Sequence, residues 1–149
     1  MKKQQGGFTL IELIMVIVIL GILAAFALPR FADFSGQARY STINGALGSV
    51  RSASAIVHAA AVAANQTSAT GTITLEGQNI ALAYGYATQA SILTAAQLSN
   101  DFNTATAGTV SLGACSFTYT AATSATSGVN ISGITGATGT PPSSCGTAP

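Results

Sequence analysis

The sequence predicts an α+β protein in which a long N-terminal helix, membrane-spanning in its first half and amphipathic in its second, packs on a small antiparallel β-sheet head. Three observations lead to this fold class: an unbroken apolar run near the N-terminus, a helical stripe of apolar residues after it, and a C-terminal half rich in Ser, Thr, Ala and Gly. The expected parts are a leader peptide at 1–7, a membrane helix at 8–29, an amphipathic helix at 30–64 and the head at 65–149.

The apolar run extends from Phe8 to Leu28 and is followed by Pro29. At about 1.5 Å per helical residue it is roughly 30 Å long, which is the thickness of a bilayer's hydrocarbon core. Its Phe, Leu, Ile and Val side chains favour insertion by roughly 4–8 kcal/mol together, whereas Glu12 opposes it by at most about 3 kcal/mol. Lys2 and Lys3 precede the run. The positive-inside rule therefore predicts a cytoplasmic N-terminus and an exported head.

The segment after Pro29 predicts an amphipathic helix, because apolar and small residues recur at steps of three and four. Gly36, Gly45 and Gly48 each weaken a helix by about 1 kcal/mol relative to Ala, so this segment must gain its stability from packing. The stripe expected to pack on the head consists of Ile43, Leu47, Val50, Ser54, Val57, Ala61 and Ala64.

The head shows short alternating segments that are typical of half-buried strands. They lie at 72–76 and 116–120, and residues 76–79 before Ile80 predict a hairpin turn. We expect a short helix over 90–98. The stretch from Thr123 to Pro142 is rich in Gly, Ser and Thr, which predicts loops with at most one strand near 129–131.

Composition argues against several classes of function. Only 6% of residues are charged, 48% are hydrophobic and the formal net charge is +1, so no basic patch is available for nucleic acid. The single histidine, His58, falls on the amphipathic helix, where a packed or surface role is expected. We expect no enzymatic activity, no cofactor and no metal site, because the four acids are scattered along the chain at Glu12, Asp33, Glu76 and Asp101.

Cys115 and Cys145 are the only cysteines, and both fall on the side expected to be exported. An even number of cysteines in an oxidising compartment favours a disulfide bond. Two free thiols are the alternative. A metal site would need soft ligands, and His58 is the only other one that the sequence offers.

The run Gly6-Gly-Phe-Thr-Leu-Ile-Glu12, after a short basic leader, resembles the precursor motif of type IV pilins. The resemblance implies cleavage between Gly7 and Phe8 by a prepilin peptidase that leaves the apolar run on the mature chain, unlike cleavage of an ordinary secretory signal. It also implies N-methylation of Phe8 and pairing of the new terminal ammonium with Glu12 of a neighbouring subunit. An α-amino group with a reference pKa of about 7.7–8.0 is largely protonated at neutral pH, so this pairing would give each buried charge a partner.

As a member of this family the chain would be the major structural subunit of a type IV pilus. Its partners would be identical subunits, the prepilin peptidase and N-methyltransferase, and the inner-membrane assembly machinery. The head would be periplasmic in the membrane pool and extracellular in the pilus, where the filament would mediate surface attachment. A minor pilin or a type II secretion pseudopilin is the alternative. Residues 51–58, together with the N-terminus, resemble the mannose-sensitive haemagglutinin pilins of aquatic Gram-negative bacteria.

The resemblance also implies a C-terminal disulfide-bounded loop and a helix that unwinds between Gly21 and Pro29 when packed in a filament. Pro29 supplies no N–H for the carbonyl of Ala25, and Gly21 is a second weak point. In a bilayer the freed backbone groups would find no partner, so we expect a continuous helix in the isolated subunit.

Overall fold

The computed structural model describes residues 7–136 and Cys145, with the side chains of residues 28–35 excepted. Within these residues the chain divides into two compact units, one ending at Phe34 and the other starting at Ser35. The first contains the N-terminal part of helix α1 (Leu10–Ala63), and the second contains the rest of α1 and the head.

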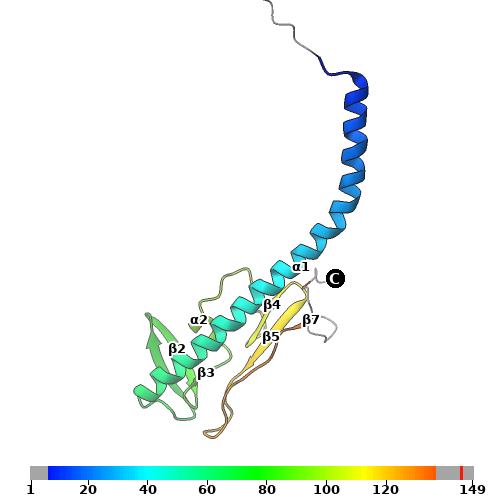
Figure 1. Ribbon diagram of the computed structural model, residues 1–149. Coiled ribbons are helices and arrows are strands. Elements are labelled where there is room, and N and C mark those ends of the chain that lie inside the picture. The colour runs from blue at the N-terminus through cyan, green and yellow to red at the C-terminus, as the bar shows by residue number, and fades with distance from the viewer. Residues whose placement is uncertain (1–6, 137–144, 146–149) are drawn as a thin grey trace, which may run out of the picture. The chain divides into compact units, whose positions relative to one another are not determined.

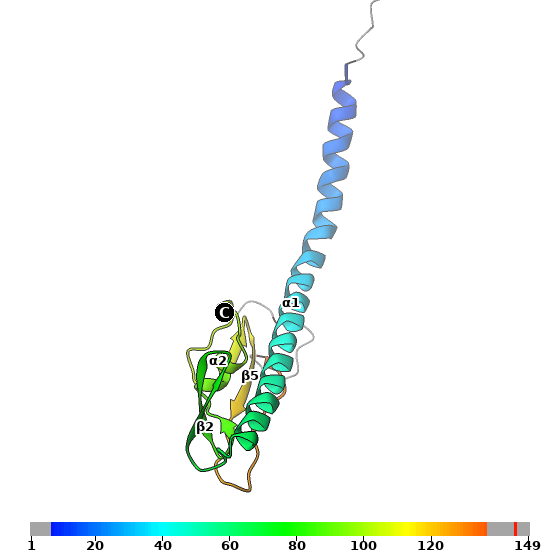
Figure 2. The same ribbon diagram turned by 90° about the vertical axis from the view of Figure 1, so that its left-hand side faces the viewer.

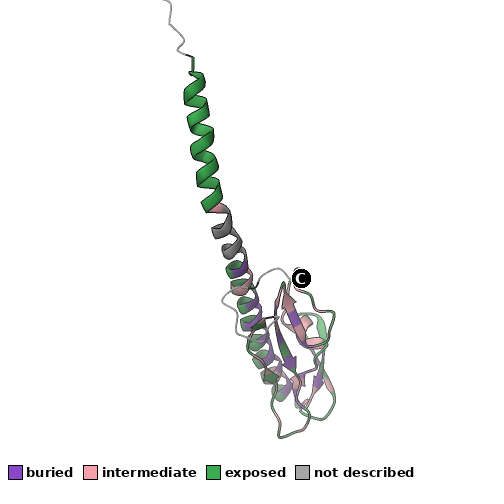
Figure 3. Cartoon of the chain, turned by 90° about the vertical axis from the view of Figure 1, so that its right-hand side faces the viewer, coloured by how far each residue is buried: buried purple, intermediate pink, exposed green. Residues whose placement is uncertain are grey.

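The N-terminal part of α1 has an apolar surface that nothing else in the described chain covers. Every residue from Leu10 to Phe26 is exposed, as the uniform green of this part in Figure 3 shows. Leu10–Ala27 has a mean hydropathy of 2.9 and is long enough to cross a membrane. The segment Gly36–Ala63 is also long and apolar enough to cross a membrane, with a mean hydropathy of 1.3. However, 39% of it is buried, as expected for the core helix of a folded domain.

Helix α1 ends in a Schellman motif. Asn65 has a φ of 60°, and its N–H and that of Gln66 donate to the carbonyls of Val62 and Ala61 at 3.1 and 2.8 Å. These bonds satisfy carbonyls that the helix itself leaves free, and Asn tolerates the left-handed conformation that they require. The helix therefore ends at Ala63, and Ala64, which was predicted on the buried stripe, is exposed.

The rest of the predicted stripe forms the α1 side of the core. All of its members from Ile43 to Ala61 are buried, and Ala46 and Ala53 join them. The head contributes the rest of the core, which consists of Ile73, Ile80, Leu82, Ala87, Ile92, Val110, Cys115, Phe117, Tyr119 and Cys145. Figures 1 and 2 show this part of α1 running alongside the sheets of the head. The predicted α+β architecture is confirmed.

The first sheet is a three-stranded antiparallel meander of β1 (Gly71–Leu75), β2 (Gln78–Ala83) and β3 (Tyr86–Ala87). Leu75 pairs with Gln78, so the first hairpin turns at Glu76-Gly77, within the predicted segment 76–79. The second hairpin turns at Tyr84-Gly85. Both turns have positive φ at both central residues, as type I′ turns require.

The second sheet contains β4 (Thr109–Leu112), β5 (Cys115–Thr120), β6 (Asn130–Ile131) and β7 (Thr135–Gly136). Strand β5 is central: it pairs with β4, and with β6 and β7 at its opposite ends. The sequence predicted β5 and β6 but missed β3, β4 and β7, and it did not separate the strands into two sheets. The predicted helix over 90–98 is shorter, because α2 runs from Ser91 to Ala95.

Candidate functional site in the N-terminal segment

The N-terminal segment begins with a backbone free of steric cover. A Cβ added at Gly7 would meet nothing within 4 Å, and the Phe8 side chain is 90% exposed. Thr9 is exposed as well, and the helix starts one residue later at Leu10. The junction between Gly7 and Phe8 therefore lies in non-helical, accessible chain directly before the apolar helix.

Thr9 and Glu12 form a capping box at the start of α1. The Thr9 N–H and hydroxyl donate to Glu12 Oε2 at 2.8 and 2.7 Å, and the Glu12 N–H donates to Thr9 Oγ1 at 3.4 Å. This reciprocal arrangement satisfies two of the N–H groups that a helix start leaves without partners. It also provides the carboxylate with two donors from its own chain, and the negative charge lies at the favourable end of the helix dipole.

Glu12 was predicted from the sequence as a functional residue, but Thr9 was not. The signal was readable, because a Thr followed three residues later by a Glu, just before an apolar run, is the pattern of a capping box. Glu12 was interpreted only through its predicted pairing with a neighbouring subunit. The structure adds an intramolecular partner, and whether the intermolecular pair forms stays a prediction.

Glu12 also lies in an apolar groove on the helix surface. The groove has a volume of about 330 Å³ and is lined by Phe8, Ile11, Met15 and Val16 in addition to Glu12. These residues are three and four positions apart and so share one face of the helix. The apolar side chains on this face are suited to being covered by lipid or by neighbouring helices. The Glu12 carboxylate on the same face then needs a polar or positively charged partner.

The predicted weak points lie further along the same helix. Gly21 is exposed, and an added Cβ there would meet nothing within 4 Å. The helix is continuous from Leu10 through Pro29 to Ala63, although Pro29 donates no backbone hydrogen bond. Unwinding in a filament concerns an assembled state and stays a prediction.

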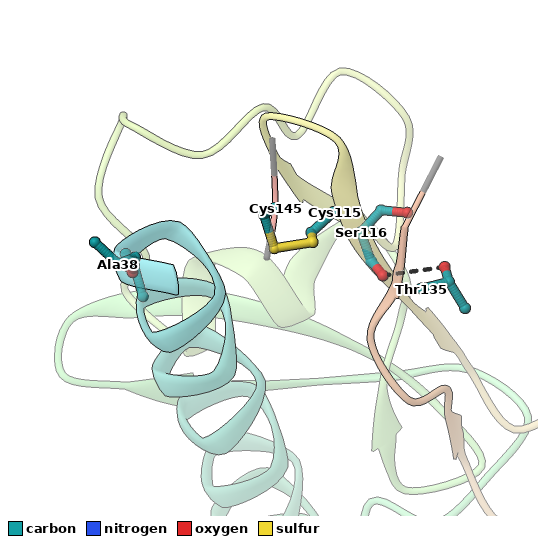
Figure 4. The surroundings of a disulfide bond; sticks show 6 residues. Ala38, Cys115, Ser116, Thr135 and Cys145 are labelled. Atoms are coloured by element: carbon teal, nitrogen blue, oxygen red, sulfur yellow. Dashed lines mark hydrogen bonds between the residues drawn. A yellow bond between two sulfur atoms is a disulfide. The ribbon is translucent and has the colours of Figure 1, made fainter. Parts of the chain in front are cut away.

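The predicted disulfide is present in the head. Cys115 and Cys145 are bonded, with their Cα atoms 5.3 Å apart, and both are buried (Figure 4). The Cys145 N–H also donates to the carbonyl of Gly36 on α1 at 3.0 Å. Cys145 is thus connected to β5 by the covalent bond and to α1 by a backbone hydrogen bond.

Comparison with known proteins matches the N-terminal segment to a recognised family motif. The model of the prokaryotic N-terminal methylation motif matches residues 2–28, which include Gly7, Phe8, Thr9 and Glu12. The chain has the N-terminus of a type IV pilin precursor. No solved structure matches it.

Several relatives are named as major pilus subunits. The chain is 53% identical over 53 residues to a type IV narrow pilus major component, PilA5, of Thermus thermophilus, an alignment that covers 36% of this chain and 46% of the relative. It is 43% identical over 53 residues to a type IV major fimbrial protein, FimA, of Dichelobacter nodosus, covering 36% of this chain and 34% of that relative. The chain thus spans about a third to a half of the length of these relatives. The likeness to mannose-sensitive haemagglutinin pilins stays a prediction.

Proposed function

We propose that this chain is the major structural subunit of a type IV pilus, which polymerises through its N-terminal helix into an extracellular filament for surface attachment. The observation that supports this most directly is the single carboxylate in the apolar, exposed segment Leu10–Ala27 of α1, held by its own capping box. An apolar surface of this length is not stable in water and requires lipid, other copies of the helix, or both. The precursor of a filament subunit is surrounded by lipid while it is in the membrane and by other copies of the helix once it is in the filament.

In this proposal, prepilin peptidase cleaves between Gly7 and Phe8 and Phe8 is then N-methylated. The mature chain remains in the inner membrane with its head in the periplasm until the assembly machinery inserts it into the filament. The role is structural rather than enzymatic. In the membrane, the donors from Thr9 reduce the cost of the Glu12 charge.

In the filament, the terminal ammonium of one subunit would be costly among apolar helices unless a carboxylate faced it. Glu12 is the only acid in the apolar run, so it is the group that can serve. Pairing with Glu12 of a neighbour would set the register between subunits. Local unwinding between Gly21 and Pro29 would accompany packing, because surrounding subunits could shield backbone groups that lipid cannot satisfy.

The test compares Glu12→Val and Glu12→Gln, each expressed without a wild-type copy. Both variants should insert and be cleaved, since neither change adds an insertion cost. Both should yield far fewer filaments than wild type, because neither supplies the negative charge. Filaments from Glu12→Gln at the wild-type level would show that an uncharged acceptor at position 12 is sufficient and that no ion pair is required.

Intact-mass measurement of sheared filaments tests processing directly. The expected subunit starts at Phe8, carries one methyl group and has an oxidised cysteine pair. A subunit that retains Met1, or one cleaved after the apolar run, would refute the proposal. A minor pilin or a pseudopilin shares the same N-terminus, and an abundant band of this chain in the sheared material distinguishes the major subunit from both.

A further inference from the structure

A second candidate site lies in the head, where four separate chain segments meet. The pocket has a volume of about 340 Å³ and opens between α1, the loop that follows it, the turn between β2 and β3, and the loop between β5 and β6. This volume is within the range of about 300–1,000 Å³ typical of small-molecule sites. Its lining consists of His58, Thr67, Tyr84, Tyr86 and residues 125–128.

His58 and Tyr86 form a fixed aromatic pair in this pocket. Their rings are stacked with centroids 4.0 Å apart and an interplanar angle of 2°. The His58 Nδ1 atom lies 3.0 Å from the carbonyl oxygen of Gly85, and because a carbonyl only accepts, Nδ1 must carry the hydrogen. In the neutral ring Nε2 is then a free acceptor. The stack and the hydrogen bond together hold the imidazole and the β2–β3 turn in one arrangement.

Tyr84 occupies a backbone position that a bulky residue rarely adopts. It is the first central residue of the type I′ turn, with a φ of 53°, where Asn, Asp and Gly are usual. The left-handed conformation costs a residue with a Cβ about 1–2 kcal/mol relative to glycine. Strain of this kind is typical of positions whose side chain is used, and the Tyr84 side chain lines the pocket.

The chemistry of the lining restricts the class of ligand. The described lining residues carry phenol, hydroxyl and imidazole groups and no carboxylate, ammonium or guanidinium group. An anion would find no permanently charged cation there, and a cation would find no anionic partner among these residues. An aromatic cage for a quaternary ammonium needs several free ring faces, but His58 already covers one face of Tyr86.

We propose that this pocket binds a neutral saccharide, with a sugar ring packed against the Tyr84 and Tyr86 rings. A sugar presents an apolar C–H face to an aromatic ring and hydroxyls to polar groups at its edge. The phenol oxygens of the two tyrosines, the Thr67 hydroxyl and His58 Nε2 supply donors and acceptors for those hydroxyls. The site lies in the head and does not depend on polymerisation.

The experiment uses the full chain in a polyoxyethylene detergent, whose headgroup is not a sugar. Ligand-observed NMR is recorded with methyl β-D-glucoside, methyl β-D-galactoside and methyl N-acetyl-β-D-glucosaminide, and with the uronic acid forms of the first two. At least one neutral glycoside should bind with a dissociation constant on the order of 1 mM, and its charged counterpart should bind more weakly. Tetramethylammonium is a further probe, and its binding in place of every sugar would overturn the proposal.

Tyr84→Asn separates binding from folding, because Asn suits the left-handed turn position. It should weaken sugar binding about tenfold without lowering the melting temperature. Glu76→Asn is the matched control, since Glu76 holds the same position in the β1–β2 turn, with a φ of 48°, and does not line the pocket. Equal binding by wild type and Tyr84→Asn, or no binding of any neutral glycoside, would refute the site.

Discussion

Tyr119 on β5 donates its phenolic hydrogen to the carbonyl oxygen of Ala87 on β3, 2.8 Å away. Both residues are buried, and the bond joins the four-stranded sheet to the three-stranded one. Burial raises the pKa of Tyr119 to about 12, and the neighbouring Ser54 hydroxyl acts in the opposite direction. The phenol is therefore held neutral and serves as the donor between the sheets.

This relationship predicts a loss of stability at alkaline pH. The folded-state pKa of Tyr119 lies above the unfolded value of about 10, so the folded protein retains this proton more strongly. Its contribution is complete below pH ~10 and is lost as the pH rises from about 10 towards 12.

Tyr119→Phe should reduce the free energy of unfolding by about 1–3 kcal/mol at neutral pH, because the Ala87 carbonyl loses its donor. Urea unfolding at pH 8 and pH 11 should show a smaller alkaline decrease for the variant than for wild type. An equal decrease in both proteins would contradict the role of Tyr119.

Gly108 should tolerate no side chain. Its φ is +77°, its carbonyl accepts from the Tyr119 N–H at 2.7 Å, and an added Cβ would collide with the Tyr119 carbonyl oxygen. Gly108→Ala combines left-handed strain with backbone overlap and should destabilise the head by about 2–5 kcal/mol. Gly77→Ala is the control, because Gly77 has a similar φ of +78° but open space around it, and it should cost about 1–2 kcal/mol. Thermal unfolding of the two variants measures the difference. Equal melting temperatures would show that a backbone shift removes the overlap with little loss of stability.

Removal of the disulfide should weaken both of the contacts that residue 145 makes, one with β5 and one with α1. Cys115 and Cys145 are 30 residues apart, and closing a loop of this size contributes roughly 3–4 kcal/mol on the chain-entropy model. The double variant Cys115→Ser, Cys145→Ser should unfold at lower denaturant concentration and lose the hydrogen bond from the Cys145 N–H to Gly36. Hydrogen exchange at the backbone N–H of residue 115, at the start of β5, should become faster. Reductant serves as the control, since it should destabilise wild type and leave the double variant unchanged.

Thr9 should affect assembly through the geometry of Glu12. Thr9→Val keeps the shape of the side chain but removes the hydroxyl that donates to and accepts from Glu12, and losing a cap of this kind costs about 1 kcal/mol. Filament yield should fall, while insertion and cleavage remain normal. Thr9→Ser keeps the hydroxyl and should assemble like wild type. If both variants gave wild-type yields, the capping box would be irrelevant to assembly.

The features that the sequence predicted correctly depend on local pattern. The apolar run before Pro29 identified the exposed helix, because its length and hydropathy need no tertiary context. The stripe from Ile43 to Ala61 identified the buried face of the second half of α1, because helical periodicity determines which residues share a face. Gly77 marked the first hairpin, because a type I′ turn requires a residue that accepts positive φ. The capping box was equally local and could have been predicted.

The remaining features depend on contacts between residues far apart in the chain. Strands β3 and β7 are two residues each, too short to show alternation, and they exist because β2 and β5 supply backbone partners. The disulfide was predicted from the number of cysteines and their expected compartment, whereas the contact of Cys145 with Gly36 was not predictable. Nothing in the local sequence places His58 against Tyr86 or brings residues 125–128 beside them. Non-local pairing is selected by the packing of the whole head, because only a shared core compensates for the entropy of closing the intervening loops.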